Sequence, residues 1–424
     1  MAGVPARIIV TDDLRRSRLT VFFRLLLAIP HLVWLALWTV AAFLAAIGNW
    51  FATLATGRSP ELLYRFLAAY VRYSTHVSAF LFLAANPFPG FTGAAGSYPI
   101  DVEIAPRAPQ HRLKTLFRLV LAVPALLLAG VLRSGGFAVG QGHGRHGGGS
   151  TGFSGSLGLL ALVAVLTWFA ALARGRAPQG FRNMLAWGLG YLAQVHAYVL
   201  VLTDRYPNTD PGAVGVLGAQ PAHPVRLRVD DDLRRSRVTV FFRLLLFVPH
   251  YIWLLLWGIA VLLAVIGNWF VTLALGRSPR AVHAFIAAYV RYQTHAYAFL
   301  GLVGNPFPGF LGRPGSYPID VEIDGPERQH RLKTLFRIFL VIPALLVDYS
   351  LSVVLAIAAF LGWFAALVTG RMPTGFRNVG AWALRYSAQT NAYLYLLTDR
   401  YPYSGPEAAA DEDEVEETSA QLAA

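Results

Sequence analysis

The chain has 424 residues, of which 55% are hydrophobic and 14% charged, and its mean hydropathy is +0.49. Because soluble domains carry about a quarter charged residues, this composition favours a membrane protein. The absence of cysteine excludes disulfides, thiolate metal sites and a cysteine nucleophile. The net charge of +13 comes with arginines at the ends of apolar segments, so we expect anionic membrane lipids, and no nucleic acid, as partners.

The chain consists of two similar halves. The stretch "DDLRRSR" at Asp12–Arg18 recurs at Asp231–Arg237, and "QHRLKTLFR" at Gln110–Arg118 recurs at Gln329–Arg337. Both pairs are separated by the same number of residues. A constant spacing of this kind indicates an internal duplication, in which each copy is a structural unit.

Each half is itself doubled, because "NWFATLATGRSP" at Asn49–Pro60 resembles "TWFAALARGRAP" at Thr167–Pro178. We therefore predict four helical modules in tandem. The predicted organisation is module 1 at 1–91, module 2 at 92–210 with a glycine-rich loop at 133–156, a linker at 211–222, module 3 at 223–310, module 4 at 311–404 and a disordered acidic tail at 405–424.

Each module is predicted to contain a short strand, a long apolar helix, a Gly-Arg-x-Pro turn and a last helix, in that order. A proline is expected to interrupt the first helix, and a tryptophan precedes the turn. Agreement among the four copies marks a repeated structural unit and identifies no catalytic residue. This repeat signature comprises Pro30, Pro124, Pro249 and Pro343, then Trp50, Trp168, Trp269 and Trp363, then Gly57, Gly175, Gly276 and Gly370.

The signature, together with the closing sequences "AYVLVLTDRYP" at Ala197–Pro207 and "AYLYLLTDRYP" at Ala392–Pro402, resembles a bacterial and archaeal membrane family. That family is known only as a domain of unknown function, number four-three-eight-nine. The resemblance covers nearly the whole chain as tandem copies. Modules 1 and 3 depart from it because they end in "NPFPGF". The resemblance implies a polytopic membrane fold and no particular activity.

The first apolar segment of each module is too long for one simple crossing. Phe22–Thr56 would extend for roughly 52 Å as a helix, against a hydrocarbon core of about 30 Å. In one alternative the chain lies at the interface up to a kink at Pro30 and then crosses. In the other it forms a helical hairpin, which the polar insert at Arg133–Ser156 and the "DYS" at Asp348–Ser350 favour.

Both alternatives return every strand to the same side of the membrane. The basic clusters beside the strands predict that this side is cytoplasmic. The sequence therefore predicts an all-α integral protein of the cell membrane with internal repeats and about eight crossings. A small cytoplasmic β-sheet of four short strands would complete the fold, with the basic clusters and the acidic tail on the same side.

The predicted strands carry complementary charges. "SYPIDVEI" occurs at Ser97–Ile104 and again at Ser316–Ile323, whereas the other two strands carry arginines. Opposite charges on neighbouring strands favour pairing, so we expect one sheet that alternates basic and acidic strands. A carboxylate metal site is disfavoured, because its ligands must converge from several directions. The expected cross-strand charges are Arg7, Asp101, Glu103, Arg226, Arg228, Asp320 and Glu322.

Two Arg-His pairs, Arg72 with His76 and Arg291 with His295, lie one helical turn apart and are candidate lipid or anion contacts. The alternative role is snorkelling toward headgroups and hydrogen bonding between helices. Asp348 is the one carboxylate deep in an apolar segment, and we expect it to be exposed at a hinge. His143 and His146 stand in a glycine-rich context that favours a linker over a metal site.

The sequence contains no nucleotide-binding, metalloprotease or hydrolase motif of the usual spacing. We therefore expect no catalytic, cofactor-binding or metal-binding residue and no enzymatic activity. The function that remains is a membrane-organising component, or one that binds lipids or a protein partner. The alternative is a transporter or channel for an anionic or amphipathic solute.

Overall fold

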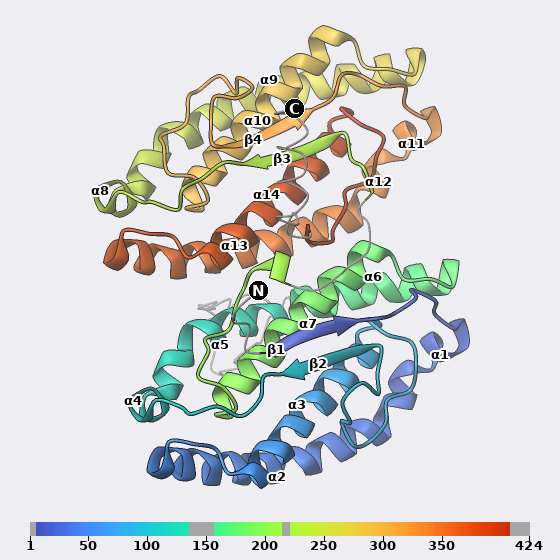
Figure 1. Cartoon of the computed structure of the whole chain (residues 1–424). Helices are drawn as coiled ribbons and strands as arrows, with labels where there is room; N and C mark the ends of the chain where they lie inside the picture. The colour runs from blue at the N-terminus through green and yellow to red at the C-terminus, as the bar shows by residue number, and fades with distance from the viewer. Residues whose placement is uncertain (1–5, 135–156, 214–220, 408–424) are drawn as a thin grey trace, which may run out of the picture. The chain divides into compact units, whose positions relative to one another are not determined.

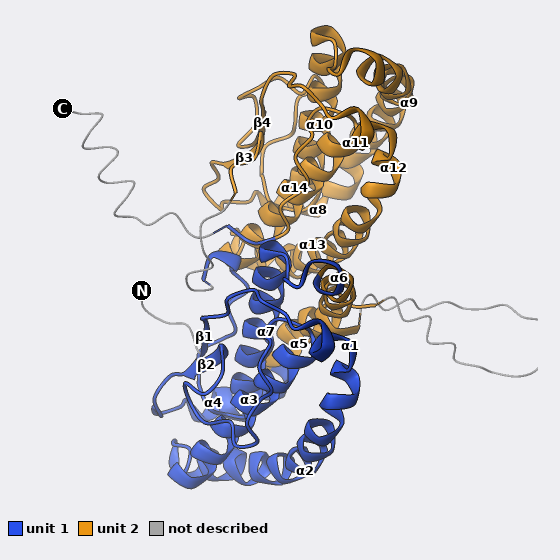
Figure 2. Cartoon of the chain, turned by 90° about the vertical axis from the view of Figure 1, so that its right-hand side faces the viewer, with its two compact units in different colours: residues 1–120, 171–220, 405–424 blue, residues 121–170, 221–404 orange. Residues whose placement is uncertain are grey.

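The computed structural model describes residues 6–134, 157–213 and 221–407, coloured along the chain in Figure 1. Two compact units can be distinguished (Figure 2). The first contains the described parts of 1–120, 171–220 and 405–424, and the second those of 121–170 and 221–404. The mostly helical character expected from the sequence is confirmed.

The elements follow the repeat. The first half contains β1 (Ala6–Val10), α1 (Arg18–Phe22), α2 (Arg24–Thr56), α3 (Glu61–Leu81), β2 (Ile100–Ile104), α4 (Arg112–Leu116), α5 (Arg118–Ser134), α6 (Leu159–Arg174), α7 (Gln179–Val199) and the short 3₁₀ helix η1 (Pro211–Ala213). The second half contains β3 (Val225–Val229), α8 (Arg237–Phe241), α9 (Arg243–Leu275), α10 (Arg280–Leu300), β4 (Ile319–Ile323), α11 (Arg331–Leu335), α12 (Arg337–Leu340), α13 (Ile342–Thr369) and α14 (Thr374–Leu394).

The Gly-Arg-x-Pro turn ends one helix and starts the next. Gly57 adopts a left-handed conformation with φ of 73° and ends α2, and Pro60 is the N-cap of α3. Glycine takes this conformation without the steric penalty that a Cβ would bring. The tryptophans before the turn donate hydrogen bonds, as Trp50 Nε1 does to the Thr115 carbonyl at 2.8 Å. The other left-handed glycines of the signature are Gly175, Gly276 and Gly370.

The prediction that the signature prolines interrupt the first helices is wrong for three modules and confirmed for module 4, where α12 ends at Leu340 and α13 begins at Ile342. Pro30 and Pro249 lie inside α2 and α9, and Pro124 lies inside α5. Only Pro343 stands at a helix start, in the first turn of α13. Pro343 lies in the first turn, where the N–H has no helical partner, whereas each of the other three prolines lies in the second turn and removes one helical hydrogen bond without ending the helix.

The hairpin favoured by the sequence is also absent where the first segment is fully described. α2 and α9 are continuous over 33 residues each, and α13 is continuous over 28. Apolar helix formers fill the place of the expected turn in α2, where the Trp38 ring stacks on Tyr73 at 5.1 Å. These three helices are long and apolar enough to cross a membrane, which is compatible with a membrane protein.

Each unit has three layers (Figure 2). In the first unit α2 packs against α3, α3 contacts α7, and the strands pack on α3 and α7. In the second unit α9 packs against α10 and α13 against α14, while β3 and β4 lie on the other side of α10 and α14. The last helix of each module is therefore covered on two sides, and the long first helix on one.

The four strands form two separate antiparallel sheets, so the prediction of one four-stranded sheet is wrong. β1 pairs with β2 and β3 with β4, with Arg7 opposite Glu103 and Arg226 opposite Glu322. A helix side chain also forms a hydrogen bond with the backbone of a strand: Arg72 Nε donates to the Val102 carbonyl at 3.2 Å. A carbonyl that is already paired offers less to a further strand.

A buried arginine begins the first helix of each module and holds the end of the last helix. Arg118 Nη1 donates to the Thr203 carbonyl at 2.6 Å, and Nη2 contacts Asp204 at 2.8 Å. Its guanidinium lies 4.4 Å from the Tyr198 ring centre. A cation at the C-terminal end of a helix is favoured by the helix dipole. Equivalent contacts are made by Arg24, Arg243 and Arg337.

We expect Arg118→Met to destabilise the first unit by about 3 kcal/mol, because it leaves Asp204 and two helix-end carbonyls without their cation. The measurement is thermal unfolding of the purified full chain in detergent. The control is Arg205→Met, since the Arg205 side chain is exposed in the next turn of chain. Equal melting temperatures for the two variants would contradict the role of Arg118.

Candidate functional site

The outward face of α2 is apolar along its whole length. Leu25, Val40 and Phe51 are 76%, 64% and 60% exposed, and they span the helix from its first turn to its last. The arginine, histidine and asparagine side chains of α2 point the other way, as Arg24, His31 and Asn49 are buried. An exposed apolar face of this length is compatible with a membrane protein.

The inward polar residues of α2 make hydrogen bonds to their own unit, although His31 Nε2 and Thr53 Oγ1 are buried without a partner. His31 Nδ1 lies 2.8 Å from the Tyr73 hydroxyl, and Asn49 Nδ2 donates to the Leu200 carbonyl at 3.0 Å. The Ser59 hydroxyl donates to Asn49 Oδ1 at 2.5 Å. The polar groups thus fasten α2 to its own unit and are turned away from the exposed face.

α9 and α13 present the same kind of surface in the second unit. On α9 the buried residues include Arg243, His250 and Asn268, and the exposed ones include Leu244 and Leu263. His250 Nδ1 lies 2.7 Å from the Tyr292 hydroxyl. The agreement between α2 and α9 follows from the sequence duplication.

Asp348 lies within continuous α13 and is half-buried, so the expectation of an exposed hinge is wrong. The Ser387 hydroxyl donates to Asp348 Oδ2 at 3.4 Å. Only one oxygen of the carboxyl group has a partner, since Asp348 Oδ1 is buried without a hydrogen bond.

A family comparison identifies the repeated unit. The family described as "Domain of unknown function (DUF4389)" matches residues 18–92, 155–209, 237–311 and 331–404, more than half of the chain. The chain belongs to the DUF4389 family. No curated protein and no solved structure matches it. All four strands lie outside the matched segments, as do α4 and α5, so the matched segments consist of helices and the loops that join them.

The Arg-His pairs of this DUF4389 chain face the strands, and the histidines are not placed to contact lipid. His76 is fully buried and its Nε2 lies 2.7 Å from Asp101 Oδ1, while His295 pairs with Asp320 at 2.8 Å. Arg291 Nε donates to the Val321 carbonyl at 3.0 Å. Because the histidines have no access to solvent or lipid, they hold a strand to a helix and contact no lipid or anion, whereas Arg72 and Arg291 are half-buried and remain candidate anion contacts.

Asp101 receives several hydrogen bonds in its buried position. The Gly96 amide donates to Oδ2 at 2.5 Å and the Val102 amide to Oδ1 at 2.8 Å, in addition to the contact with His76. Burial raises the pKa of Asp101, but the hydrogen bonds from His76, Gly96 and Val102 outweigh it, so the pKa lies below its ordinary value of 3.8. Asp320 repeats this arrangement with His295 and Gly315.

The remaining strand charges are exposed. Arg226 contacts Glu322 at 3.5 Å and Asp324 at 2.9 Å, so its pKa lies above its ordinary value, with Asp324 as the main cause. Arg228 lies 3.6 Å from Asp230, although its strand partner is Asp320. Sequence reasoning missed Asp324 and Asp230, whose signal was their position at the ends of the charged strands.

Metal ligation gains no support from the described chain. Within residues 6–134, 157–213 and 221–407, no three His, Asp or Glu side chains form a group that could hold an ion. His143 and His146, along with most of the acidic tail, lie outside the described residues.

We expect Asp101→Asn to lower the stability at neutral pH by about 1.5–3 kcal/mol, because it removes the charge that His76 and two amides contact. A carboxyl group with a lowered folded pKa stabilises the fold above pH 3.8, and this contribution is lost as the pH falls through the folded value. The variant should therefore lose less stability in acid than the parent chain. Thermal unfolding against pH measures both effects.

The control for this experiment is Glu103→Gln, because Glu103 is exposed on the same strand. It should unfold like the parent chain at neutral pH. If Asp101→Asn followed the acid dependence of the parent chain, the carboxylate at 101 would not be the group that stabilises the fold.

Proposed function

We propose that this DUF4389 chain is a non-enzymatic component of the cell membrane that organises the bilayer by binding lipids. The observation that carries the proposal is the uninterrupted apolar face of α2, repeated on α9, with the polar residues of both helices turned inward. A face of this length would be unfavourable in water, whereas acyl chains would cover it.

Cationic side chains near the ends of α2 support binding to anionic lipid headgroups. Arg18 and Arg58 lie just outside the ends of α2 and are exposed. Arg18 Nη2 donates to the Ala173 carbonyl at 3.0 Å, which leaves its other nitrogens for headgroup phosphates. Such residues contribute roughly 1 kcal/mol each near an anionic surface.

The non-enzymatic part of the proposal is supported by the buried charged groups, which form ion pairs with one another. Arg118 contacts Asp204, Arg16 contacts Asp12 at 2.9 Å, and His76 contacts Asp101. Each pair joins segments of the same unit. Groups that already hold the fold together offer little for acid-base catalysis or nucleophilic attack.

A transporter or channel for an anionic or amphipathic solute is the second candidate. The feature in its favour is a hollow of about 530 Å³ bordered by Arg228 and Arg291. Asp320 and Glu322 line the same hollow, and it lies beside the strands. A mixed-charge hollow on the strand side is a weaker basis for transport than the long apolar face is for lipid binding.

Glutamate at four exposed positions should release the chain from membranes: Phe43 and Leu44 on α2, and their equivalents Leu262 and Leu263 on α9. Charge in the acyl layer is unfavourable, so we expect a loss of at least tenfold in the fraction that floats with anionic liposomes. Circular dichroism should stay unchanged, because these side chains are exposed. Retention of the variant on liposomes would contradict the proposal.

The matched control adds the same number of glutamates on the strand side. Its positions are Ile9, Thr11, Ser97 and Ser316, all of which are exposed. We expect this variant to float like the parent chain, which separates an effect of the apolar face from an effect of charge.

A further inference from the structure

The middle of α2 lies level with the strands of its unit. Ala42 is close to the midpoint of the 33-residue helix, and it belongs to one buried cluster with Leu67 and Val71 of α3 and Val102 of β2. At the same level, the Thr39 hydroxyl lies 3.0 Å from the Tyr70 hydroxyl of α3. A line from the middle of α2 through α3 therefore reaches the β1–β2 sheet.

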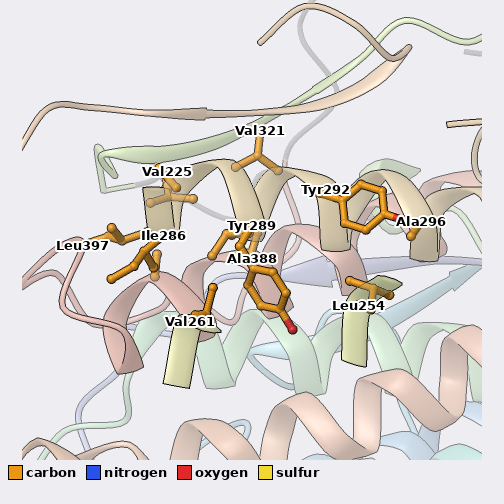
Figure 3. Close-up of a cluster of buried hydrophobic side chains, with 13 residues drawn as sticks. Val225, Leu254, Val261, Ile286, Tyr289, Tyr292, Ala296, Val321, Ala388 and Leu397 are labelled. Atoms are coloured by element: carbon orange, nitrogen blue, oxygen red, sulfur yellow. The ribbon is translucent and has the colours of Figure 1, made fainter. Parts of the chain in front are cut away.

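The second unit repeats this order of layers. Val261 of α9, Ile286 of α10 and Val225 of β3 share a buried cluster. Figure 3 shows Val225 and Val321 on the strand side, with Ile286 and Tyr289 between them and Val261. Val261 is close to the midpoint of α9, as Ala42 is to that of α2.

α13 follows the same rule. Leu355, near the midpoint of α13, packs against a cluster that contains Leu384 of α14 and Ile319 of β4. All three long apolar helices thus have a charged strand opposite their middle, with one helix in between.

The depth of the strands decides how these helices can meet a bilayer. If α2 crossed the membrane, its middle would lie at the bilayer midplane, and the strands level with it would lie at the same depth. Arg7 and Glu103 are exposed on those strands, and Arg226 and Asp324 form an exposed ion pair in the second sheet. Exposed charges on strands at that depth are unfavourable.

The length of the apolar face leads to the same orientation. A helix of 33 residues is roughly 50 Å long, whereas the hydrocarbon core is about 30 Å thick. A crossing helix would have to tilt steeply or leave apolar residues at both ends in water. A helix that lies in the membrane plane buries its whole outward face at one depth.

We infer that the long helices of each unit, α2 in the first and α9 and α13 in the second, lie in the plane of a leaflet, with their outward faces among the upper acyl segments and the strands of the unit in water. The ligand of this surface is a lipid monolayer. The inference rests on the proposed lipid binding and replaces the eight expected crossings by insertion from one side. In each unit the last helices then separate the lipid layer from the charged strands.

Site-directed spin labelling tests this orientation, and the natural chain is suited to it because it contains no cysteine. Single cysteines at Leu25, Val40 and Phe51 place labels at the start, middle and end of the exposed face of α2. The full chain is reconstituted into liposomes of zwitterionic and anionic phospholipid. Collisions with oxygen and with a water-soluble nickel chelate then report the depth of each label.

We expect the three labels to lie at one shallow depth, roughly 5–10 Å below the phosphates. A label at Val40 near the midplane, between two shallow labels, would overturn the in-plane orientation and leave the proposed lipid binding intact. If the nickel chelate reached all three labels as freely as in water, the proposed function itself would fail. The two failures are therefore distinguishable.

A sidedness measurement provides a second readout. Arg18→Cys and Arg58→Cys flank α2, and a membrane-impermeant maleimide is applied to closed liposomes that hold the chain in one orientation. In-plane insertion predicts that both cysteines react from the same side of the membrane. Reaction from opposite sides would overturn the inference.

Discussion

The fold depends on a buried cation at the end of a helix. In every module an arginine at the start of the first helix donates to carbonyls that the last helix leaves without partners, and an aromatic ring of that helix lies over its guanidinium. The helix dipole and the charge-assisted hydrogen bonds favour the same placement. This contact holds the start of the first helix to the end of the last and makes each module a closed unit.

Other buried side chains beside this contact support an unfavourable backbone conformation. The chain leaves the last helices through residues with positive φ, which are Leu83, Val201, Leu302 and Leu396. A side chain with a Cβ is strained there by about 1–2 kcal/mol. The carbonyls of two of these residues accept hydrogen bonds from buried side chains: Arg16 Nε donates to the Leu83 carbonyl and Gln110 Nε2 to the Val201 carbonyl. The strain persists because surrounding contacts determine the path of the chain.

The side-chain partner of the buried arginine differs between the modules. In modules 2 and 4 the Thr-Asp-x-Tyr-Pro sequence supplies an acid, as Asp204 does for Arg118 and Asp399 for Arg337. In modules 1 and 3 the equivalent position is Asn86 or Asn305, and the acid comes before the first helix. Asp12 there contacts Arg16, which in turn donates to the Ala84 carbonyl. The departure of "NPFPGF" from the family pattern therefore replaces the acid beside Arg24 by an asparagine, and the ion pair of Asp12 with Arg16 adds a second cation at the helix end.

Much of this architecture can be predicted from residues alone. Glycine at a left-handed helix end and proline at the next N-cap are local requirements, so the Gly-Arg-x-Pro turn located both helices of every module. The alternation of apolar and charged residues in "IDVEI" and "VRLRV" identified strands, because the two-residue period of a strand is also a local property. Which strands pair was harder to predict, since a basic strand can pair with either acidic strand. The side chains of Arg72 and Gln389, which donate to strand carbonyls, come from distant helices.

Local sequence thus determined the repeat, the helix ends, the strands and the apolar character of the long helices, because each depends on residues close together in the chain. The partners of the buried polar groups were decided by tertiary structure: His76 could have met lipid until the fold brought Asp101 within 2.7 Å of it. Tertiary structure also placed charged strands opposite the middle of α2, and that placement bears on how the helix meets a bilayer. Hydropathy measures how apolar a segment is, whereas its orientation depends on what lies behind it.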